Sequence, residues 1–176
     1  SVAYSVFDIH IQPGIVYEPH PAFVKKGGRY AYHHLDSKTR ASLRQPSDLP
    51  KQASREVTAA DYVYQIKRLA SPKVQSPILG VMNKNIVGLK AYANTILKEY
   101  ELLESDKKLA YLDLNQHPVE GVKAISRYHF QIIIKGVYPQ FKYWLAMPFF
   151  APIPWEVDQF YSQKGMKANN IGFDWH

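Results

Sequence analysis

The sequence contains no cysteine at all. This absence excludes a disulfide framework, a zinc site built from thiolates, an iron–sulfur cluster and a cysteine nucleophile. A long apolar run is missing too, because residues 143–155, the longest one, are interrupted by Pro148, Pro152 and Pro154. That run is shorter than the roughly 20 residues that a membrane-spanning helix needs, and its prolines would break such a helix.

Motifs typical of catalytic sites are also absent. The sequence has no GxSxG, P-loop, GxGxxG or HExxH motif. Among the carboxylates, Asp61 suits the cap of a helix, and Glu99, Glu101 and Glu104 suit a solvated helix surface. No acid–base pair can therefore be assigned from the sequence.

The histidines do not have the spacing of a metal site. No two of them lie four residues apart on a predicted helix, and the adjacent His33 and His34 would point to opposite faces of a strand. We interpret them as scattered surface residues and predict no metal site. The seven histidines are His10, His20, His33, His34, His117, His129 and His176.

What is present is the composition of an ordinary globular chain. Its 176 residues are 46% hydrophobic and 21% charged, which excludes a disordered tail and fits one domain over residues 1–176. The net charge of +7 permits an anionic partner without requiring one. No nucleic acid is expected, because the charge is dispersed and the aromatic residues fall mostly on apolar faces.

Alternating hydrophobicity predicts a half-buried strand over residues 6–12 and a β-hairpin made of residues 122–126 and 129–135. Between them, residues 25–56 look like a long basic loop with a short helix near 38–44, which we interpret as a solvated insertion. Loops of this length are uncommon unless they are functional or mobile. Basic residues in this segment include Lys25, Lys26, Arg29, Lys38, Arg40 and Arg44.

Helical spacing of apolar residues predicts several helices. The phrase Thr58-Ala59-Ala60-Asp61 is a capping box that begins a helix, and Ser71-Pro72 ends it. A long amphipathic helix is predicted over residues 86–105, with Leu97 on its apolar stripe and Lys90 on its polar face. Shorter helices are predicted after Pro139 and over 155–163. The order of elements predicts an α+β fold, with a small mixed β-sheet and packed helices around a common core.

The proline-rich stretch 147–155 is compatible with two structures. It can be a rigid buried crossover between two helices, or it can form the wall of an apolar cleft or a face that docks on another domain.

Three phrases in order resemble a known family. Residues 57–72 read VTAADYVYQIKRLASP, residues 7–16 read FDIHIQPGIV, and residues 121–135 read GVKAISRYHFQIIIK, followed by Tyr138-Pro139-Gln140-Phe141 and Pro152-Ile153-Pro154. The first resembles the signature of the bacterial extracellular solute-binding proteins of family five, the oligopeptide- and dipeptide-type binding proteins of ABC importers. The second and third are similar to that family's first strand and its later hairpin. Gln12 stands where the family has arginine.

This resemblance implies the fold of the second domain of a peptide-binding protein of the periplasmic-binding-protein type II class. Because the chain opens within a predicted strand and shows no signal peptide, we expect it to be a piece of a longer protein. The resemblance implies that the whole protein has about three domains. The family resemblance further implies a periplasmic or lipoprotein-anchored location and a peptide or other small solute as ligand. It also implies a binding protein that is not an enzyme and needs no cofactor. The remaining domains of the same protein and ABC permease subunits would be its partners, and we expect a monomer.

Candidate ligand-binding residues follow from the resemblance and lie in the loop after the signature helix: Ser76, Pro77, Ile78, Met82 and Asn83. A purely structural loop is an equally good interpretation of this segment. Thr58, Asp61, Arg68 and Pro72 are the structural signature. The alternative function, from a different class, is a stand-alone basic interaction domain that binds an anionic polymer such as nucleic acid.

Overall fold

The computed structural model describes residues 3–105 and 111–166. Contacts divide the chain into two compact units. Unit 1 comprises Ser1–Pro13, Thr58–Lys108 and Leu112–Ile153, and unit 2 comprises Gly14–Val57, Leu109–Tyr111 and Pro154–His176. The predicted α+β class is confirmed. The single domain over 1–176 stays a prediction, and each unit is described by itself.

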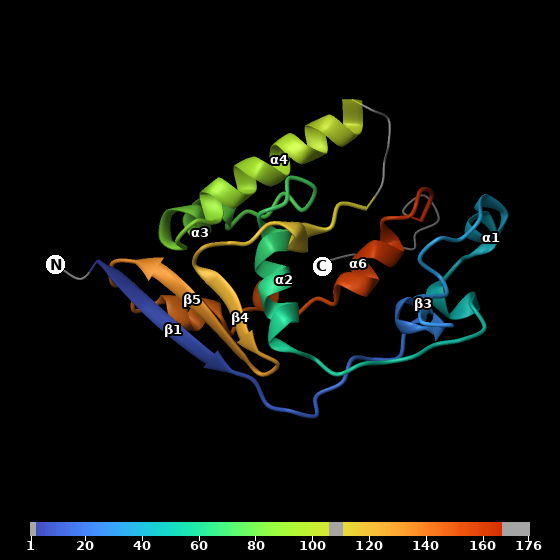
Figure 1. Cartoon of the computed structure of the whole chain (residues 1–176), viewed down its shortest axis with the longest axis horizontal. Helices are drawn as coiled ribbons and strands as arrows, with labels where there is room; N and C mark the ends of the chain where they lie inside the picture. The colour runs from blue at the N-terminus through green and yellow to red at the C-terminus, as the bar shows by residue number, and fades with distance from the viewer. Residues whose placement is uncertain (1–2, 106–110, 167–176) are drawn as a thin grey trace. The chain divides into compact units, whose positions relative to one another are not determined.

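Unit 1 contains a three-stranded sheet in the order β1-β5-β4, formed by β1 (Tyr4–His10), β5 (His129–Lys135) and β4 (Val122–Ser126) (Figure 1). The hairpin has the predicted bounds, and β1 shows the predicted alternation of half-buried and exposed residues. All pairs are antiparallel, so the predicted mixed sheet is wrong in this respect. The short turn between β4 and β5 imposes that direction, because parallel neighbours need a long crossover.

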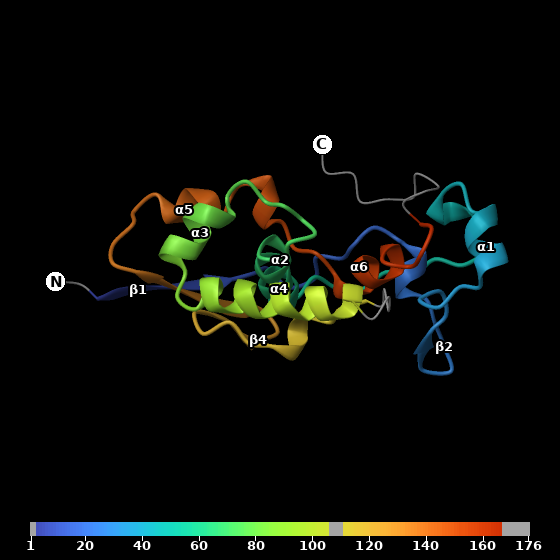
Figure 2. The ribbon, with the colours of Figure 1, turned by 90° about the horizontal axis from the view of Figure 1, so that it is seen from above.

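Helices α2 (Ala59–Leu69), α3 (Leu79–Asn85), α4 (Leu89–Ser105) and α5 (Phe141–Trp144) complete unit 1, and α2 packs against β4 and β5. The short 3₁₀ helices Leu114–Gln116 and Pro148–Phe150 join them. In Figure 2, α4 extends as one long helix from the end at which α3 lies. None of the described helices is long and apolar enough to cross a membrane.

Two helix predictions need correction. The predicted loop 76–83 is partly helical, because α3 begins at Leu79. Helix α4 begins at Leu89 and not at residue 86, since Ile86 is extended and forms a bridge to Ile134 of β5. The side of α4 that is buried carries Leu89, Tyr92 and Ile96, whereas Leu97 of the predicted stripe is 44% exposed.

The core of unit 1 lies between the sheet and α2, α3 and α4. β5 supplies every second residue to it, as expected for a central strand with one covered face. The largest fully buried side chains of this core are Tyr64, Ile66, Met82, Ile86, Leu89, Ile96, Leu114, Phe130, Ile132, Ile134 and Phe141.

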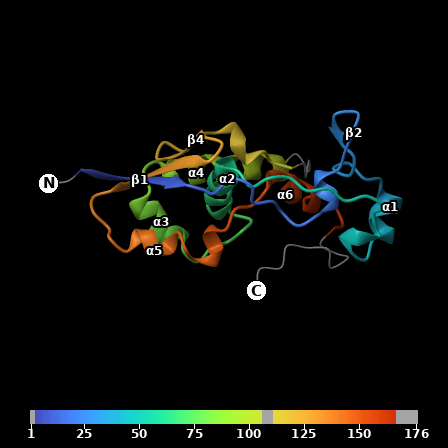
Figure 3. The ribbon, with the colours of Figure 1, turned by 90° about the horizontal axis from the view of Figure 1, so that it is seen from below.

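Unit 2 has little regular structure. It contains the hairpin of β2 (Lys25–Lys26) and β3 (Arg29–Tyr30), helices α1 (Ser37–Ser42) and α6 (Trp155–Tyr161), and the 3₁₀ helices Pro21–Phe23 and Pro46–Asp48. Figures 2 and 3 show that the β2–β3 hairpin protrudes from the rest of this unit. The short helix predicted near 38–44 corresponds to α1.

The segment predicted as a solvated insertion contributes to a core. Leu43 and Leu49 are 5% and 6% exposed, although both lie in the basic segment 25–56. They belong to a buried cluster that gathers residues from both ends of unit 2: Ala22, Phe23, Leu43, Leu49, Val157, Phe160 and Met166. The segment is therefore anchored by single apolar residues, whose spacing in the sequence follows neither a helical nor a strand period.

Candidate functional site

The predicted ligand-binding residues do not form one surface. Pro77 is exposed, and Ser76 and Ile78 are half-buried, with Ile78 directly preceding α3. Met82 is completely buried in the core of unit 1, so it offers no surface to a ligand arriving from solvent. Asn83 is half-buried and lines an open groove. The ligand-binding role of these residues stays a prediction.

This α3–α4 groove lies where α3 leads into α4, next to the end of β5, and has a volume of about 340 Å³. Gly88 makes the bend between the two helices possible, because its φ of 78° is in the left-handed region. An added Cβ there would approach the Cβ of Glu120 to 2.7 Å. The groove is lined by Asn83, Ile86, Gly88, Lys90, Ala91, Asn94 and Lys135.

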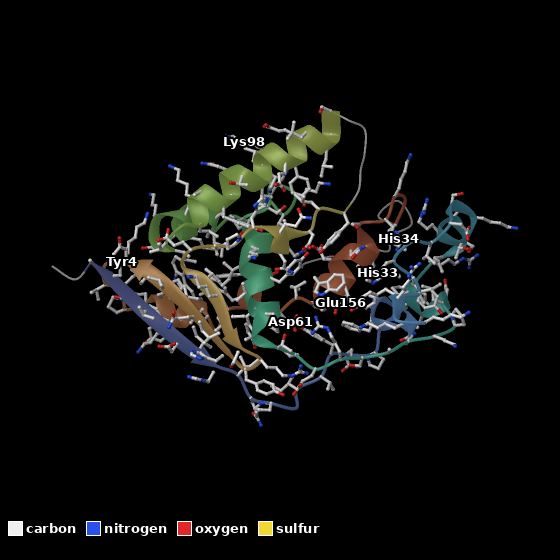
Figure 4. All side chains as sticks on the ribbon, in the orientation of Figure 1. Tyr4, His33, His34, Asp61, Lys98 and Glu156 are labelled. Carbon is white, nitrogen blue, oxygen red and sulfur yellow. The ribbon has the colours of Figure 1, made fainter. Side chains whose placement is uncertain are left out.

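The signature residues have structural surroundings. The backbone N–H of Thr58 donates to Asp61 Oδ2 at 2.9 Å, which completes the predicted capping box at the start of α2. Asp61 is 3% exposed and Arg68 is 8% exposed, while Pro72 is half-buried just beyond the helix. The capping prediction is confirmed, because the Asp61 carboxylate accepts from the backbone at the helix start. Figure 4 labels Asp61 at this end of α2.

Unit 2 contains a buried polar cluster that sequence reasoning missed. Arg55 holds Glu156 with two hydrogen bonds of 2.7 Å, from Nε to Oε1 and from Nη2 to Oε2. The Tyr30 hydroxyl donates to Glu156 Oε1 at 3.2 Å. Burial and then the nearby Glu156 charge raise the pKa of Tyr30 to about 12. Glu156 is thus an acceptor saturated by its partners, which is typical of a structural carboxylate.

Two histidines of unit 2 are buried or half-buried, so their interpretation as surface residues is wrong. His33 is 4% exposed, stacks on the Tyr30 ring at 4.3 Å, and donates from Nε2 to the Ala22 carbonyl at 2.8 Å. Trp155 meets the rings of both residues edge-on. Burial lowers the pKa of His33. Figure 4 shows His33 and Glu156 in this cluster, whereas the adjacent His34 is exposed.

His20 is a neutral helix cap. Its Nδ1 accepts from the Ala22 N–H at 3.0 Å, so its proton sits on Nε2, which donates to the Tyr161 hydroxyl at 3.0 Å. Burial lowers the pKa of His20 to about 4. A neutral ring with both nitrogens engaged does not serve as a metal ligand. It stabilises the 3₁₀ helix that follows it.

A third cluster lies on the exposed face of the unit 1 sheet. His10 and His129 are directly opposite each other on β1 and β5 and stack at 4.2 Å. His129 donates from Nε2 to Asp8 Oδ1 at 2.7 Å, and Gln131 donates to the same oxygen at 3.0 Å. These bonds, that of Gln131 first, lower the pKa of Asp8. Within the described ranges, no group of three or more histidines and carboxylates could hold a metal ion.

Comparisons of the chain with protein-family models, with curated proteins and with solved structures found no match.

Proposed function

We propose that the chain is part of the substrate-binding component of an ABC importer, with oligopeptides or dipeptides as the preferred ligand class. In this role it catalyses no reaction. It binds the solute outside the cytoplasm and delivers it to a permease in the membrane. The proposal starts from the three phrases that resemble the solute-binding proteins of family five. Their resemblance supplies the ligand class, the permease as partner and the periplasmic or lipoprotein-anchored location.

The observation that carries the proposal is the way in which unit 1 joins these three phrases. They are separated by long stretches of sequence, yet all three meet at the turn of the β4–β5 hairpin. Ile11 of the first phrase donates its N–H to the Tyr128 carbonyl at 2.9 Å, and Ala59 of the signature donates to the Arg127 carbonyl at 2.8 Å.

Side chains join the same segments. Tyr62 of α2 stacks on Phe130 of β5, with the ring centroids 5.1 Å apart and an angle of 15° between the rings. β1 pairs with β5 along its whole length, from Tyr4 opposite Lys135 to His10 opposite His129. A family signature made of three distant phrases is best explained when those phrases build one structural nucleus, which supports the proposed kinship.

Thermal-shift measurements on the complete natural gene product test this proposal. We expect one class among peptides, sugars and metal chelates to raise its melting temperature, because a ligand that binds only the folded state stabilises it. A protein whose melting temperature responds to no member of such a panel would contradict the proposal.

Retention on heparin and single-stranded DNA tests the alternative, a domain that binds an anionic polymer. In the β2–β3 hairpin, Lys26 lies directly opposite Arg29, and this pair of exposed cations is the feature that favours it. A steep fall of affinity with salt and a defined site size would support the polymer and contradict transport. Weak retention without a site size is the result expected for a transport protein.

A further inference from the structure

The α3–α4 groove gathers positive charge from two separate elements. Lys90 is in the first turn of α4, and Lys135 is the last residue of β5. Both residues are exposed, and the part of the chain that the structure describes provides neither of them with an ion-pair partner. No carboxylate is among the residues that line the groove. Two lysines therefore line one depression, and its lining contains no carboxylate.

The start of α4 adds to this positive potential. A helix of 17 residues carries a partial positive charge at its N-terminus, and here the first turn contains no acidic residue. Gly88, which directly precedes α4, has no side chain that could accept a hydrogen bond from the first amides. A cation such as Lys90 is electrostatically unfavourable at this end of a helix. An anion in the groove would offset this positive potential.

The remaining lining residues suit a small ligand. Asn83 and Asn94 carry neutral amide donors, and Ile86 and Ala91 are apolar. The volume of about 340 Å³ lies at the lower end of the range of small-molecule sites. Glu120 is the acidic residue that packs beside Gly88, but it does not line the groove. The groove thus has room for a small molecule and the donors for one anionic group.

We propose that the α3–α4 groove is a binding site for a small oxyanion, a phosphate or carboxylate group. Lys90 and Lys135 would form charge-assisted hydrogen bonds with its oxygens, and the first amides of α4 would face it. This site is separate from the transport proposal and does not depend on it, since it follows from the charges and the shape of unit 1 alone.

Nuclear magnetic resonance titration of the whole chain tests the site. Inorganic phosphate and acetate are added in separate experiments at constant ionic strength, with chloride as the balancing anion. We expect saturable shifts of the backbone amides of Gly88, Lys90 and Ala91, and the tighter of the two anions identifies the preferred oxyanion. Shifts that grow linearly, or that chloride reproduces, would overturn the proposal.

Two matched variants distinguish a built site from general attraction to a basic chain. Lys90→Gln removes a lining charge, and we expect it to weaken binding about tenfold. Lys98→Gln removes the same charge from the same helix, but Lys98 does not line the groove and lies on the side of α4 turned away from the sheet (Figure 4). Equal weakening by both variants would overturn the proposal. Because both lysines are exposed, amide spectra of the free variants should retain the dispersion of the parent.

Discussion

Unit 1 joins its distant segments through a continuous backbone ladder, whereas unit 2 has isolated backbone bridges and joins its two ends through side chains. In unit 1, β1 and β5 pair over seven residues although more than a hundred residues separate them in sequence. In unit 2, single bridges from Val16 to Glu56 and from His20 to Ala53 link two segments of the backbone. The two ends of the unit meet through the side chains of Arg55 and Glu156 and through the core around Phe160.

This difference has consequences for stability. A backbone ladder tolerates many substitutions because every residue contributes the same groups. A side-chain cluster depends on individual residues, so single substitutions in unit 2 should have larger effects than comparable polar substitutions in unit 1. Hydrogen exchange followed by mass spectrometry reports on peptides of each unit separately and can test this comparison.

The largest expected effect comes from truncating a buried ring in either unit. Phe130 and Phe160 are 2% and 0% exposed. We expect Phe130→Ala to destabilise unit 1, and Phe160→Ala to destabilise unit 2, by about 3–5 kcal/mol each. Amide protection should fall in β1, β5 and α2 for the first variant, and in residues 20–57 and α6 for the second. Equal loss of protection in both units from either variant would contradict the division into two compact units.

Breaking the buried ion pair comes next. Glu156→Gln leaves the Arg55 charge without its carboxylate, and since the Glu156 side chain is only 4% exposed, we expect unit 2 to lose about 3 kcal/mol of unfolding free energy. Asp8→Asn in unit 1 is the matched control, because it removes one charge from the exposed His129 pair. Urea denaturation should show a far smaller loss for the control, and comparable losses would argue against a side-chain-dependent unit 2.

Acid should affect unit 2 before unit 1. His20 has a folded pKa of about 4 against an ordinary value of 6.5, so the unfolded state binds more protons between these two values. The contribution of His20 to the unfolding free energy is fully present above pH 6.5. About 2 kcal/mol of it is lost as the pH falls to 4, a value reduced because the ring is partly exposed to solvent. His33 shifts in the same direction.

In unit 1 the lowered pKa of Asp8 gives stability that is lost only when the pH falls below the ordinary aspartate value.

The His20→Asn variant tests this comparison, because asparagine can cap the helix but cannot take up a proton. Unit 2 of this variant should lose less unfolding free energy between pH 6.5 and 4 than unit 2 of the parent. Unfolding of unit 2 with the same pH dependence in this variant would show that His20 is not the group responsible.

The smallest expected effect concerns the signature helix. Thr58→Ala removes the hydroxyl of the capping box and should destabilise unit 1 by about 1 kcal/mol. Thr58→Ser retains the hydroxyl and should leave the urea midpoint unchanged. If both variants are as stable as the parent, the capping box contributes nothing measurable and unit 1 depends on its sheet and core alone.

Local patterns were sufficient to predict much of unit 1. The alternation in 122–126 and 129–135 gave the hairpin its bounds, and Thr58 with Asp61 marked the start of α2, because each signal lies within a few neighbouring residues. Helix α3 was missed because seven residues of mixed polarity after Ser76-Pro77 have too little periodicity. The buried side of α4 was misassigned because its contacts, including those of Tyr92, are set by tertiary packing.

Unit 2 could not be predicted in this way. Leu43 and Leu49 stand among charged residues, and the cluster that buries them includes Val157 and Phe160, which lie about a hundred residues further along the chain. Arg55 and Glu156 are separated by 101 positions, so no local pattern connects them. Of the residues that line the α3–α4 groove, the sequence predicted only Asn83 as part of a binding site. Asn83 was named from the sequence, but Lys90 was placed on a solvated helix face and Lys135 at the end of a strand.

Solute uptake by living cells tests the central claim most directly. The natural gene is deleted in a strain of the source organism whose other peptide importers have been removed, and the uptake of radiolabelled dipeptides and oligopeptides is measured with and without the gene on a plasmid. The account predicts that uptake of at least one peptide class is lost on deletion and restored by the plasmid. Uptake of every peptide at the same rate with and without the gene would contradict the assignment to a peptide importer.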